Sequence, residues 1–404
     1  MSTTMISSEQ NVRRKRLSRP VAFAAIAAIF IAFTAASSAP SPLYVVYQQL
    51  WGFSAVTLTV VFAVYVVGLV GALLVLGALS DHIGRRPVLA AAIALEVVAL
   101  ILFVSAGNVE VLLTARFLQG VATGAAMTTL GATLVDLNPP HAPGRAGLLN
   151  SIVPPSGLAL GSLGAGALVQ YAPGPTHLVW AILLAGMVLA GVLVLLLPET
   201  SAKRPGVVAS LLPKLGVPAR LRADLFALVP ILVASWALGG LYMSLGPSVA
   251  VGVFGLGSHL IGGLVVSLLC GTGALTAFAL RSYPTPRVLV IAGALLSIGT
   301  AVTLIGMEAG SVLTAAVGTV LAGIGFGASS LASFGTLALL AAPTERGELF
   351  AVALTISYVA FSVPAVIAGL AATTYGLRST ALIYGLVVVS LGGLALLAQR
   401  TRRP

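Results

Sequence analysis

The chain has 404 residues, of which 58% are hydrophobic and only 8% are charged. Because soluble domains carry about 25% charged residues, this composition excludes an ordinary soluble protein and indicates a chain that is solvated by lipid. The net charge of +11 lies in short patches between apolar runs, which argues against a nucleic-acid-binding surface. The single cysteine, Cys270, excludes a structural disulfide within a monomer.

A polar and basic segment opens the chain and is followed by twelve apolar runs. Each run is close to the length of about 20 residues that an α-helix needs to cross a hydrocarbon core. The first run ends in small residues, as a secretory signal does, but its length and the runs that follow favour an uncleaved helix. The longest runs are expected to include re-entrant or loop residues at their ends. The predicted spans are residues 20–39, 55–78, 87–105, 110–137, 145–170, 177–197, 225–248, 258–280, 288–306, 311–340, 348–371 and 379–398.

The basic residues indicate how these spans are oriented. If the N-terminus is cytoplasmic, 19 of the 21 basic residues fall in the tails and loops on that side. Arg378 lies on the other side, and Arg116 lies within a span. This bias predicts a multi-pass protein of the cell membrane with both termini in the cytoplasm, and therefore an even number of spans.

The longest polar break, residues 198–224, divides the spans into six and six. Arg145 and Arg346 stand before spans five and eleven in similar surroundings, 201 residues apart, which is a weak internal echo of a duplicated unit. Two such halves around a midplane site are common in secondary transporters. The predicted parts are a cytoplasmic tail (1–19), a six-helix bundle (20–197), a central cytoplasmic loop (198–224), a second six-helix bundle (225–398) and a cytoplasmic tail (399–404).

The turn between spans two and three carries four ionisable side chains within residues 77–87. Gly84 permits a reversal of the backbone. Asp81 is expected to accept hydrogen bonds from free N–H groups at a helix start, where the helix dipole favours an anion. Arg85 and Arg86 favour the cytoplasmic face of the membrane.

This turn resembles the signature loop of the major facilitator superfamily, G-x-L-x-D-x-x-G-R-R/K. The matching residues are Gly77, Leu79, Asp81, Gly84, Arg85 and Arg86. Residues 116–120 resemble the R-x-x-Q-G element of the same family, and residues 198–200 resemble its P-E-T ending. With the arrangement of six and six spans, the resemblance covers the whole chain, although the motifs lie in the first half.

The resemblance implies an all-α integral membrane protein with 12 transmembrane helices in two six-helix bundles. It also implies a secondary transporter that works as a monomer and is not an enzyme. In the family, the loop aspartate and arginines make charge-assisted contacts between the halves and hold the outward-facing state. The implied conformational switch therefore consists of Gly77, Asp81, Gly84, Arg85 and Arg86. A simple topology anchor is the alternative for this turn.

Span five departs from the G-P-x-x-G-G pattern of the family's antiporters. Ser162 stands where proline is expected, and Ala165 falls in the Gly-Gly region. This departure weakens the case for antiport without excluding it. The small residues of this span also permit close helix packing, and Pro154 and Pro155 are expected to bend the helix.

Ionisable side chains inside a membrane are costly, so each is a candidate for function. Glu96 in span three and Arg116 in span four are predicted to couple transport to a proton gradient. Burial disfavours the charged form of a carboxyl group, which suits Glu96 to proton exchange. A structural ion pair between the two residues is the alternative. Asp136, at the inner end of span four, is explained by solvation at the interface.

The candidate substrate cavity is neutral, aromatic and weakly polar, and each of its residues has ordinary packing as an alternative. Such a cavity favours bulky hydrophobic or amphipathic solutes, and the scarcity of fixed charge disfavours a highly charged one. In the family, spans one, four, seven and ten, with parts of two, five, eight and eleven, line the central cavity. The candidates are Phe33, Thr34, Tyr65, Gln119, Thr123, Met127, Asn150, Trp236, Tyr242, Ser330, Phe334, Tyr358 and Phe361.

The sequence contains no phosphate-binding loop of the G-x-x-x-x-G-K-[ST] type, and its four histidines lie apart without metal-ligand spacing. We therefore expect no cofactor, no metal and no nucleic-acid partner, only a small-molecule substrate, protons and the bilayer. The leading hypothesis is proton-coupled export of small hydrophobic or amphipathic compounds, including drugs. Proton-coupled uptake of a neutral solute such as a sugar or metabolite is the alternative. A non-transporting sensor or enzyme would need a soluble domain or a catalytic cluster, and the sequence offers neither.

Overall fold

The computed structural model describes residues 16–142, 144–212, 216–342 and 345–400. Most of the two predicted tails, including the basic residues 13–15, 402 and 403, lies outside the described residues. Every regular element within the described ranges is a helix. The fold is therefore the all-helical one that the apolar runs predict.

The first half of the chain contains six long helices, with shorter ones in the connections. The long helices are α1 (Arg19–Ser38), α3 (Ala55–Leu76), α5 (Arg85–Val104), α6 (Val109–Asp136), α7 (Arg145–Tyr171) and α8 (Pro175–Leu196). The shorter ones are α2 (Pro40–Trp51), which extends α1 beyond Ala39, then α4 (Leu79–Ile83) and α9 (Val207–Ser210).

The second half repeats this layout. A 3-10 turn, η1 (Ala219–Leu221), leads directly into its first long helix. The long helices are α10 (Arg222–Ser244), α12 (His259–Ala279), α13 (Thr285–Glu308), α14 (Val312–Leu340), α15 (Arg346–Tyr375) and α16 (Leu377–Arg400), with the short α11 (Gly246–Gly252) after α10.

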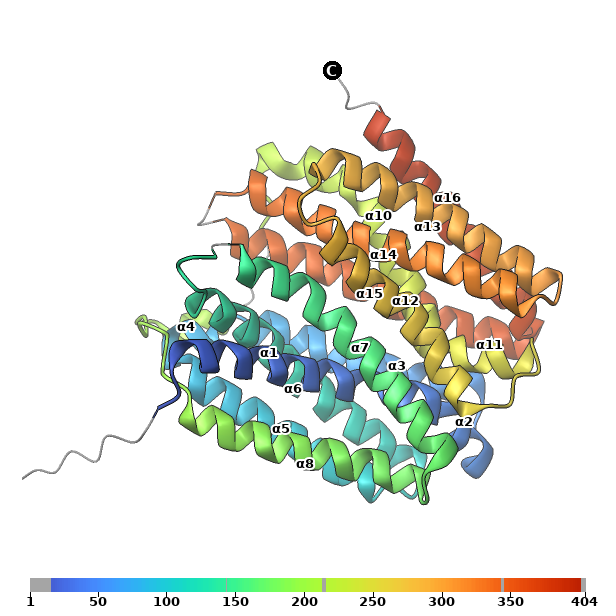
Figure 1. The fold of residues 1–404 in the computed structure, drawn as a ribbon, viewed down its shortest axis with the longest axis horizontal. Coiled ribbons are helices and arrows are strands. Elements are labelled where there is room, and N and C mark those ends of the chain that lie inside the picture. The colour runs from blue at the N-terminus through green and yellow to red at the C-terminus, as the bar shows by residue number, and fades with distance from the viewer. Residues whose placement is uncertain (1–15, 143, 213–215, 343–344, 401–404) are drawn as a thin grey trace, which may run out of the picture.

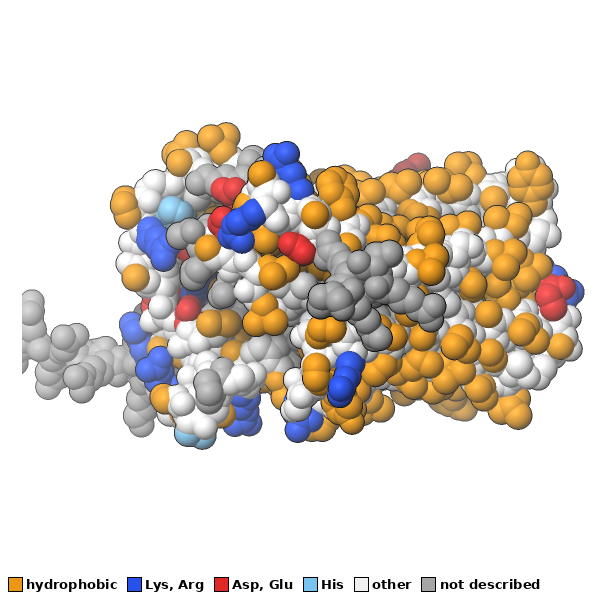
Figure 2. All heavy atoms as spheres, turned by 90° about the horizontal axis from the view of Figure 1, so that it is seen from above, with side chains coloured by type: hydrophobic (Ala, Val, Ile, Leu, Met, Phe, Trp, Pro, Cys, Tyr) orange, Lys and Arg blue, Asp and Glu red, His pale blue; other side chains and the backbone are white. Residues whose placement is uncertain are grey.

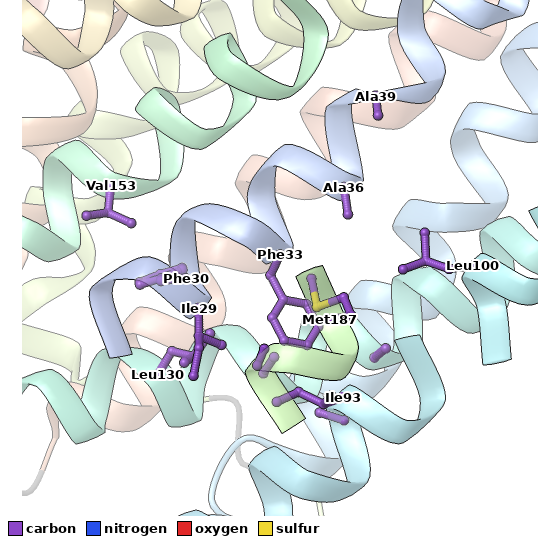
Figure 3. Close-up of a cluster of buried hydrophobic side chains, with 14 of the residues drawn as sticks. Ile29, Phe30, Phe33, Ala36, Ala39, Ile93, Leu100, Leu130, Val153 and Met187 are labelled. Carbon is purple, nitrogen blue, oxygen red and sulfur yellow. The ribbon is translucent and has the colours of Figure 1, made fainter. Parts of the chain in front are cut away.

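Each set of six long helices forms a bundle around its own apolar core, and the bundles lie side by side (Figure 1). The N-terminal core brings together side chains from α1, α5, α6, α7 and α8. In Figure 3, Phe33 of α1 lies against Met187 of α8 in this core. The C-terminal core joins α10, α12, α13, α14, α15 and α16. A smaller third core, which includes Phe62 and Phe361, joins α3 to α10, α12 and α15 across the two bundles.

The outer surface of the bundles is that of a membrane protein. Within the described ranges, eleven helical segments are long and apolar enough to span a bilayer. The remaining long helix, α6, packs between α3 and α5 as a twelfth long helix, and it carries Arg116 and Gln119. Figure 2 shows a broad apolar surface, with most of the visible charged side chains toward the left end of the view and a few at the right end.

The long helices differ from expectation at their ends. Helices α6 and α14 are helical over 28 and 29 residues, so the expectation of loop or re-entrant residues at the ends of these spans is wrong. Helices of this length extend for about 42 Å, and a tilt or an extension beyond the hydrocarbon core accommodates the excess. The first span is also longer than predicted, because the helix continues past Pro40 to Trp51.

The two ends of the molecule differ in how the bundles meet. We call the end with α4 and residues 197–221 the basic end, and the end with α2 and α11 the opposite end. From the middle to the opposite end, α7 packs closely along α12. We call this contact, together with the hydrogen bond between α2 and α10, the seam. Its hydrogen bonds run from Ser41 Oγ to Met243 O (2.7 Å), from Ser162 Oγ to Gly263 O (3.2 Å) and from Ser267 Oγ to Ala159 O (2.5 Å).

Candidate functional site

The charged turn between α3 and α5 folds around one glycine and one glutamate. Gly84 has φ 114° and ψ 154°, a conformation that favours glycine because a side chain is strained there. Glu199 accepts hydrogen bonds from Arg85 N (2.8 Å) and Arg86 N (3.2 Å), the first N–H groups of α5. The expectation that Asp81 satisfies free N–H groups at this helix start is therefore wrong, because Glu199 occupies that place.

The arginines of the turn connect it to neighbouring helices of the N-terminal bundle. Arg85 pairs with Asp81 (2.6 Å) and with Asp136 of α6 (3.1 Å). Arg86 donates to the carbonyl oxygens at the end of α8, with Leu195 O at 2.5 Å. The explanation of Asp136 by solvation alone is wrong, because it binds Arg85 and accepts a hydrogen bond from Thr200 (2.9 Å).

The environment of Glu199 stabilises its ionised form. Burial on its own would raise the pKa of this carboxyl group. The backbone N–H groups of Ser201, Arg85, Arg86 and Thr200 outweigh that effect, so that the pKa of Glu199 lies below its usual range. The carboxylate thus holds the P-E-T segment against the start of α5 as a fixed anion.

A second group of polar residues lies inside the N-terminal bundle, at mid-helix. Glu96 of α5 is fully buried, and Arg116 and Gln119 of α6 are buried beside it. Gln119 stands between the two charges: its Nε2 donates to Glu96 Oε1 (3.0 Å), and its Oε1 accepts from Arg116 Nη1 (2.5 Å). Glu96 Oε2 and Arg116 Nε have no hydrogen-bond partner. The pairing of Glu96 with Arg116 is thus indirect, through an amide.

This network reaches the interface between the bundles through Tyr65. The guanidinium of Arg116 lies over the Tyr65 ring, 4.2 Å from its centroid, which is a favourable cation–π geometry. Arg116 also donates to Ser37 O (3.3 Å), and the Tyr65 hydroxyl donates to Ser37 Oγ (3.0 Å). Because Tyr65 belongs to the core that joins the bundles, a change of charge at Glu96 or Arg116 acts close to the surface where the bundles meet.

An aromatic cluster occupies that interface. Trp236 of α10 contacts the rings of Tyr358 (4.8 Å between centroids) and Phe361 (5.9 Å) of α15 in edge-on geometry. Phe62 of α3 lies 5.0 Å from Phe361 across the bundles. The indole Nε1 of Trp236 is buried without a partner. We call Phe62, Tyr65, Trp236, Tyr358 and Phe361 the aromatic cluster.

Among the other predicted cavity residues, Thr123 lies beside the polar network of α5 and α6, since its hydroxyl donates to Gln119 O (2.8 Å) and lies 3.5 Å from Ser37 Oγ. The remaining ones lie elsewhere. Thr34 bonds to a backbone carbonyl of its own helix, and Asn150 donates to Gly131 O (3.3 Å) within the N-terminal bundle. Phe33 is buried in the core of that bundle, and Met127 packs against the same core. In the C-terminal bundle, Phe334 stacks on Phe350, Tyr242 bonds to Thr319 (2.8 Å), and Ser330 is half-buried on α14.

Sequence reasoning found four of the five aromatic residues and missed Phe62. The signal was present, because Phe62 stands one helical turn before Tyr65, so that both side chains share a face of α3. It also missed Tyr44, which is fully buried and whose hydroxyl has no hydrogen-bond partner.

The glycine-rich segment of α7 serves the packing of helices. A Cβ on Gly161 would lie 2.1 Å from Ala35 O of α1, and one on Gly166 would lie 2.8 Å from His259 O of α12. Ser162, the residue in the place of the antiporter proline, forms part of the seam. One side of this segment therefore packs against α1, and the opposite side packs against the C-terminal bundle. This is the tight packing that small residues permit.

Comparison with known proteins agrees with this architecture. The chain matches the family model of the Major Facilitator Superfamily over residues 22–285. A curated relative, the MFS-type transporter paaT of Penicillium rubens (strain Wisconsin 54-1255), is 34% identical over 143 residues. That match covers 35% of this chain and only 26% of the relative, so it spans about a quarter of the relative's length.

Solved structures with a similar fold include the nucleoside transporter NupG (TM-score 0.73, 12% identity, 94% of this chain and 100% of that chain). The human organic anion transporter MFSD10 is also similar (TM-score 0.68, 17% identity, 94% of this chain and 100% of that chain). So is a bacterial homologue of the human lysosomal transporter Spinster (TM-score 0.73, 14% identity, 95% and 97%). At these identities the likeness shows the fold alone. Because the family match covers well over half of the chain, the protein belongs to the Major Facilitator Superfamily and is a membrane-embedded secondary transporter, not an enzyme.

Proposed function

We propose that this transporter exports small hydrophobic or amphipathic compounds, including drugs, in exchange for protons. The observation that carries the proposal is the chain of contacts from Glu96 through Gln119 and Arg116 to Tyr65. This chain connects a buried carboxyl group to the surface where the two bundles meet. A proton bound at one end of it therefore acts on the other.

Glu96 is the proposed proton site. One of its oxygens is held by Gln119, and the other is unpartnered and can receive a proton without breaking a hydrogen bond. Protonation removes the negative charge that lies across Gln119 from Arg116. The electrostatic attraction that holds the Arg116 guanidinium near Glu96 is then weaker. The free energy of the contact between this guanidinium and the Tyr65 ring therefore changes. In this way proton binding biases the packing of the bundles.

The aromatic cluster is the proposed substrate site. It lies between the bundles, where alternating access exposes a shared site first to one side and then to the other. Aromatic faces offer large apolar contact areas, and the free indole N–H of Trp236 offers one hydrogen-bond donor. Such a site suits a molecule with an apolar body and few polar atoms.

The switch residues support a state that is closed at the opposite end. The seam bonds the bundles there, while Asp81, Arg85 and Arg86 make the contacts described above within the N-terminal bundle and its following segment. The charge bias predicts that the basic end is cytoplasmic and that the protein lies in the cell membrane. With that orientation, we expect the bundles to separate first at the cytoplasmic end, where an exporter collects its substrate. In the other state, we expect the turn to contact the C-terminal bundle.

Transport into inverted membrane vesicles tests the proposal. With an acidic interior, vesicles should accumulate members of a panel of neutral or singly charged aromatic compounds, and collapse of the gradient should release them. Glu96→Gln should abolish this accumulation, because a neutral amide cannot exchange a proton. Glu110→Gln, which alters an exposed acid at the start of α6, is the matched control and should transport normally.

Two results would overturn the proposal. Accumulation of a neutral solute such as a sugar in right-side-out vesicles, with none of the panel accumulating in inverted ones, would establish uptake instead. Undiminished gradient-driven accumulation by Glu96→Gln would remove that carboxyl from the coupling step.

A further inference from the structure

The first long helix of each half is interrupted by a proline near the opposite end of the molecule. Helix α1 gives way to α2, which begins at Pro40, and α10 gives way to α11, whose second residue is Pro247. A proline has no N–H group, so the carbonyl four residues before it loses the donor that a continuous helix would supply. The carbonyls freed in this way are Ala36 O in α1 and Met243 O in α10.

Both freed carbonyls accept hydrogen bonds from side chains of other helices. Gln119 Nε2 of α6 donates to Ala36 O (3.1 Å). Ser41 Oγ of α2 donates to Met243 O of the other bundle (2.7 Å). The first bond attaches the end of α1 to the polar network, because the same Nε2 also donates to Glu96 Oε1 (3.0 Å). The second attaches the start of α2 to the C-terminal bundle.

The proline break in α1 therefore lies between these two attachments. Arg116 adds to the hold on α1, because its Nη1 donates to Ser37 O (3.3 Å), the carbonyl after Ala36. Only residues 38–40 separate these carbonyls from Ser41. A helix can change direction at a proline, where a backbone hydrogen bond is missing. A displacement of the polar network can thus reach Ser41 through a few residues at a point where the helix bends.

We propose that this break couples the proton site to the opposite end of the molecule, with Pro40 and Ser41 as positioning residues for transport. When Glu96 gains or loses its charge, its hydrogen bond to Gln119 changes in strength, and the hold of Gln119 on Ala36 O changes with it. Helix α2 then changes its angle to α1, and the bond from Ser41 to the C-terminal bundle forms or breaks. Its breakage lets the two bundles separate at the opposite end.

Few ionisable groups surround Glu96. Helices α6 and α8 pack against α5. Helix α6 presents Arg116 to the network, and its acidic residues lie at its two ends. Helix α8 has one ionisable side chain, His177, near its start. Beyond Arg116 lies Tyr65 of α3, whose phenol ordinarily ionises near pH 10. A response to pH that originates at Glu96 is therefore identified by substitution of that residue alone.

Pulsed electron paramagnetic resonance measures the opening of the opposite end. Nitroxide labels on Leu50→Cys of α2 and on Val312→Cys at the start of α14, two exposed positions, report the distance between the bundles. The full-length protein, with Cys270→Ala, is measured in lipid nanodiscs from about pH 5 to about pH 9. The fraction of molecules with the longer distance should change with pH, and Glu96→Gln should abolish this change.

Pro40→Ala tests the break itself. The new N–H competes with Gln119 for Ala36 O and makes the helix continuous, so the distance between the labels should lose its response to pH. Pro42→Ala is the matched control, because the carbonyl that Pro42 frees, Ser38 O, is not the one that Gln119 holds. This variant should respond to pH as the parent protein does.

The inference rests on the proton site of the proposed function, and the variants separate the two. A parent protein without a response to pH, or a response that persists in Glu96→Gln, would overturn that proton site and the coupling through the break with it. A response that Glu96→Gln abolishes but Pro40→Ala retains would overturn the role of the break alone.

Ser41→Ala tests the attachment to the other bundle, whether or not Pro40→Ala folds. It should raise the ratio of long to short distances about fivefold at every pH, the equivalent of one hydrogen bond. Ser248→Ala is the control, because the hydroxyl of Ser248, which follows Pro247 as Ser41 follows Pro40, has no hydrogen-bond partner within the described part of the chain. It should leave the ratio unchanged. An unchanged ratio in Ser41→Ala would overturn the role of its hydroxyl.

Discussion

The two bundles share a layout but differ in their buried polar groups. The N-terminal bundle encloses an acid and a base, Glu96 and Arg116, joined by Gln119. The C-terminal bundle buries hydroxyls instead, with Tyr242 bonded to Thr319. Because the ionisable pair lies in the first bundle, the proton coupling that we propose is placed there. The second bundle contributes apolar surface and hydroxyls that do not change with pH.

The largest predicted effect comes from removing Gln119, which connects Glu96 to Arg116 in the N-terminal bundle. Gln119→Leu removes the hydrogen-bond partner of Glu96 and one of the partners of Arg116, and it leaves the buried carboxylate unsatisfied, which should cost about 3–5 kcal/mol. Thr319→Val, the matched change in the C-terminal bundle, removes one neutral hydrogen bond and should cost about 1 kcal/mol. Thermal unfolding in the same detergent compares the two. Equal losses would show that the network carries no unsatisfied charge and would break the comparison.

The next effect concerns the seam where the bundles meet. A Cβ on Gly263 would lie 2.4 Å from Ser162 O, so Gly263→Val should destabilise the closed opposite end by about 1–3 kcal/mol. A thiol reporter at the seam, Ser41→Cys in a Cys270→Ala background, should then react several-fold faster with a membrane-impermeant maleimide.

Gly257→Val is the control for this change, because a Cβ on Gly257 meets no atom within 4 Å. It should leave the reactivity of the reporter unchanged. If Gly263→Val also leaves the reactivity of the reporter unchanged, the two bundles do not separate along this seam. The description of the molecule as two bodies that move apart there would then be wrong.

The sequence predicted the fold well because its strongest signals are physical requirements of a bilayer. A helix that crosses lipid must be long and apolar, and charge must gather at one end, so spans and loops follow from composition. Glu96 and Arg116 stood out for the same reason, since an ionisable group inside a membrane span is rare. The position of Gln119 between them depends on how α5 packs against α6, and no spacing along one helix reveals that.

The cavity residues were harder to predict, because every face of these helices is apolar. In a soluble helix, polar residues mark the outer face, but here both lipid and protein interior select apolar side chains. Phe33 and Thr34 are neighbours in sequence, yet Phe33 enters the bundle core while Thr34 bonds back to Phe30 O (2.9 Å) and packs near Gly157. The composition of a helix therefore identifies candidate residues, but it does not indicate which face of the helix lies against the other bundle.

A smaller effect is expected at the basic end, where each bundle uses a glutamate. Glu199 accepts four backbone N–H groups, so Glu199→Gln should cost about 1 kcal/mol. Its pKa is lowered in the folded protein, so this stabilisation is full above the unfolded value of about 4.3 and is lost as the pH falls through the lower folded value. The difference in unfolding temperature between wild type and variant should therefore be full at pH 7 and shrink in acid.

Glu345 provides the comparison from the C-terminal half. It accepts from Ala342 N (3.0 Å) and pairs with Arg220, which is largely exposed. Exposed ion pairs contribute about 0–1 kcal/mol, so Glu345→Gln should destabilise the protein less than Glu199→Gln at pH 7. A larger loss of stability in Glu345→Gln than in Glu199→Gln would mean that the P-E-T segment does not anchor α5.

The smallest effect tests the comparison most finely, because it uses the same change in both bundles. Tyr242→Phe removes the hydroxyl that bonds to Thr319, and Tyr65→Phe removes the hydroxyl that bonds to Ser37. Each should cost about 1 kcal/mol or less in stability. Only Tyr65 lies under the Arg116 guanidinium, so only Tyr65→Phe should shift the pH profile of gradient-driven transport. An equal shift in Tyr242→Phe would show that the hydroxyls of the C-terminal bundle also take part in proton coupling.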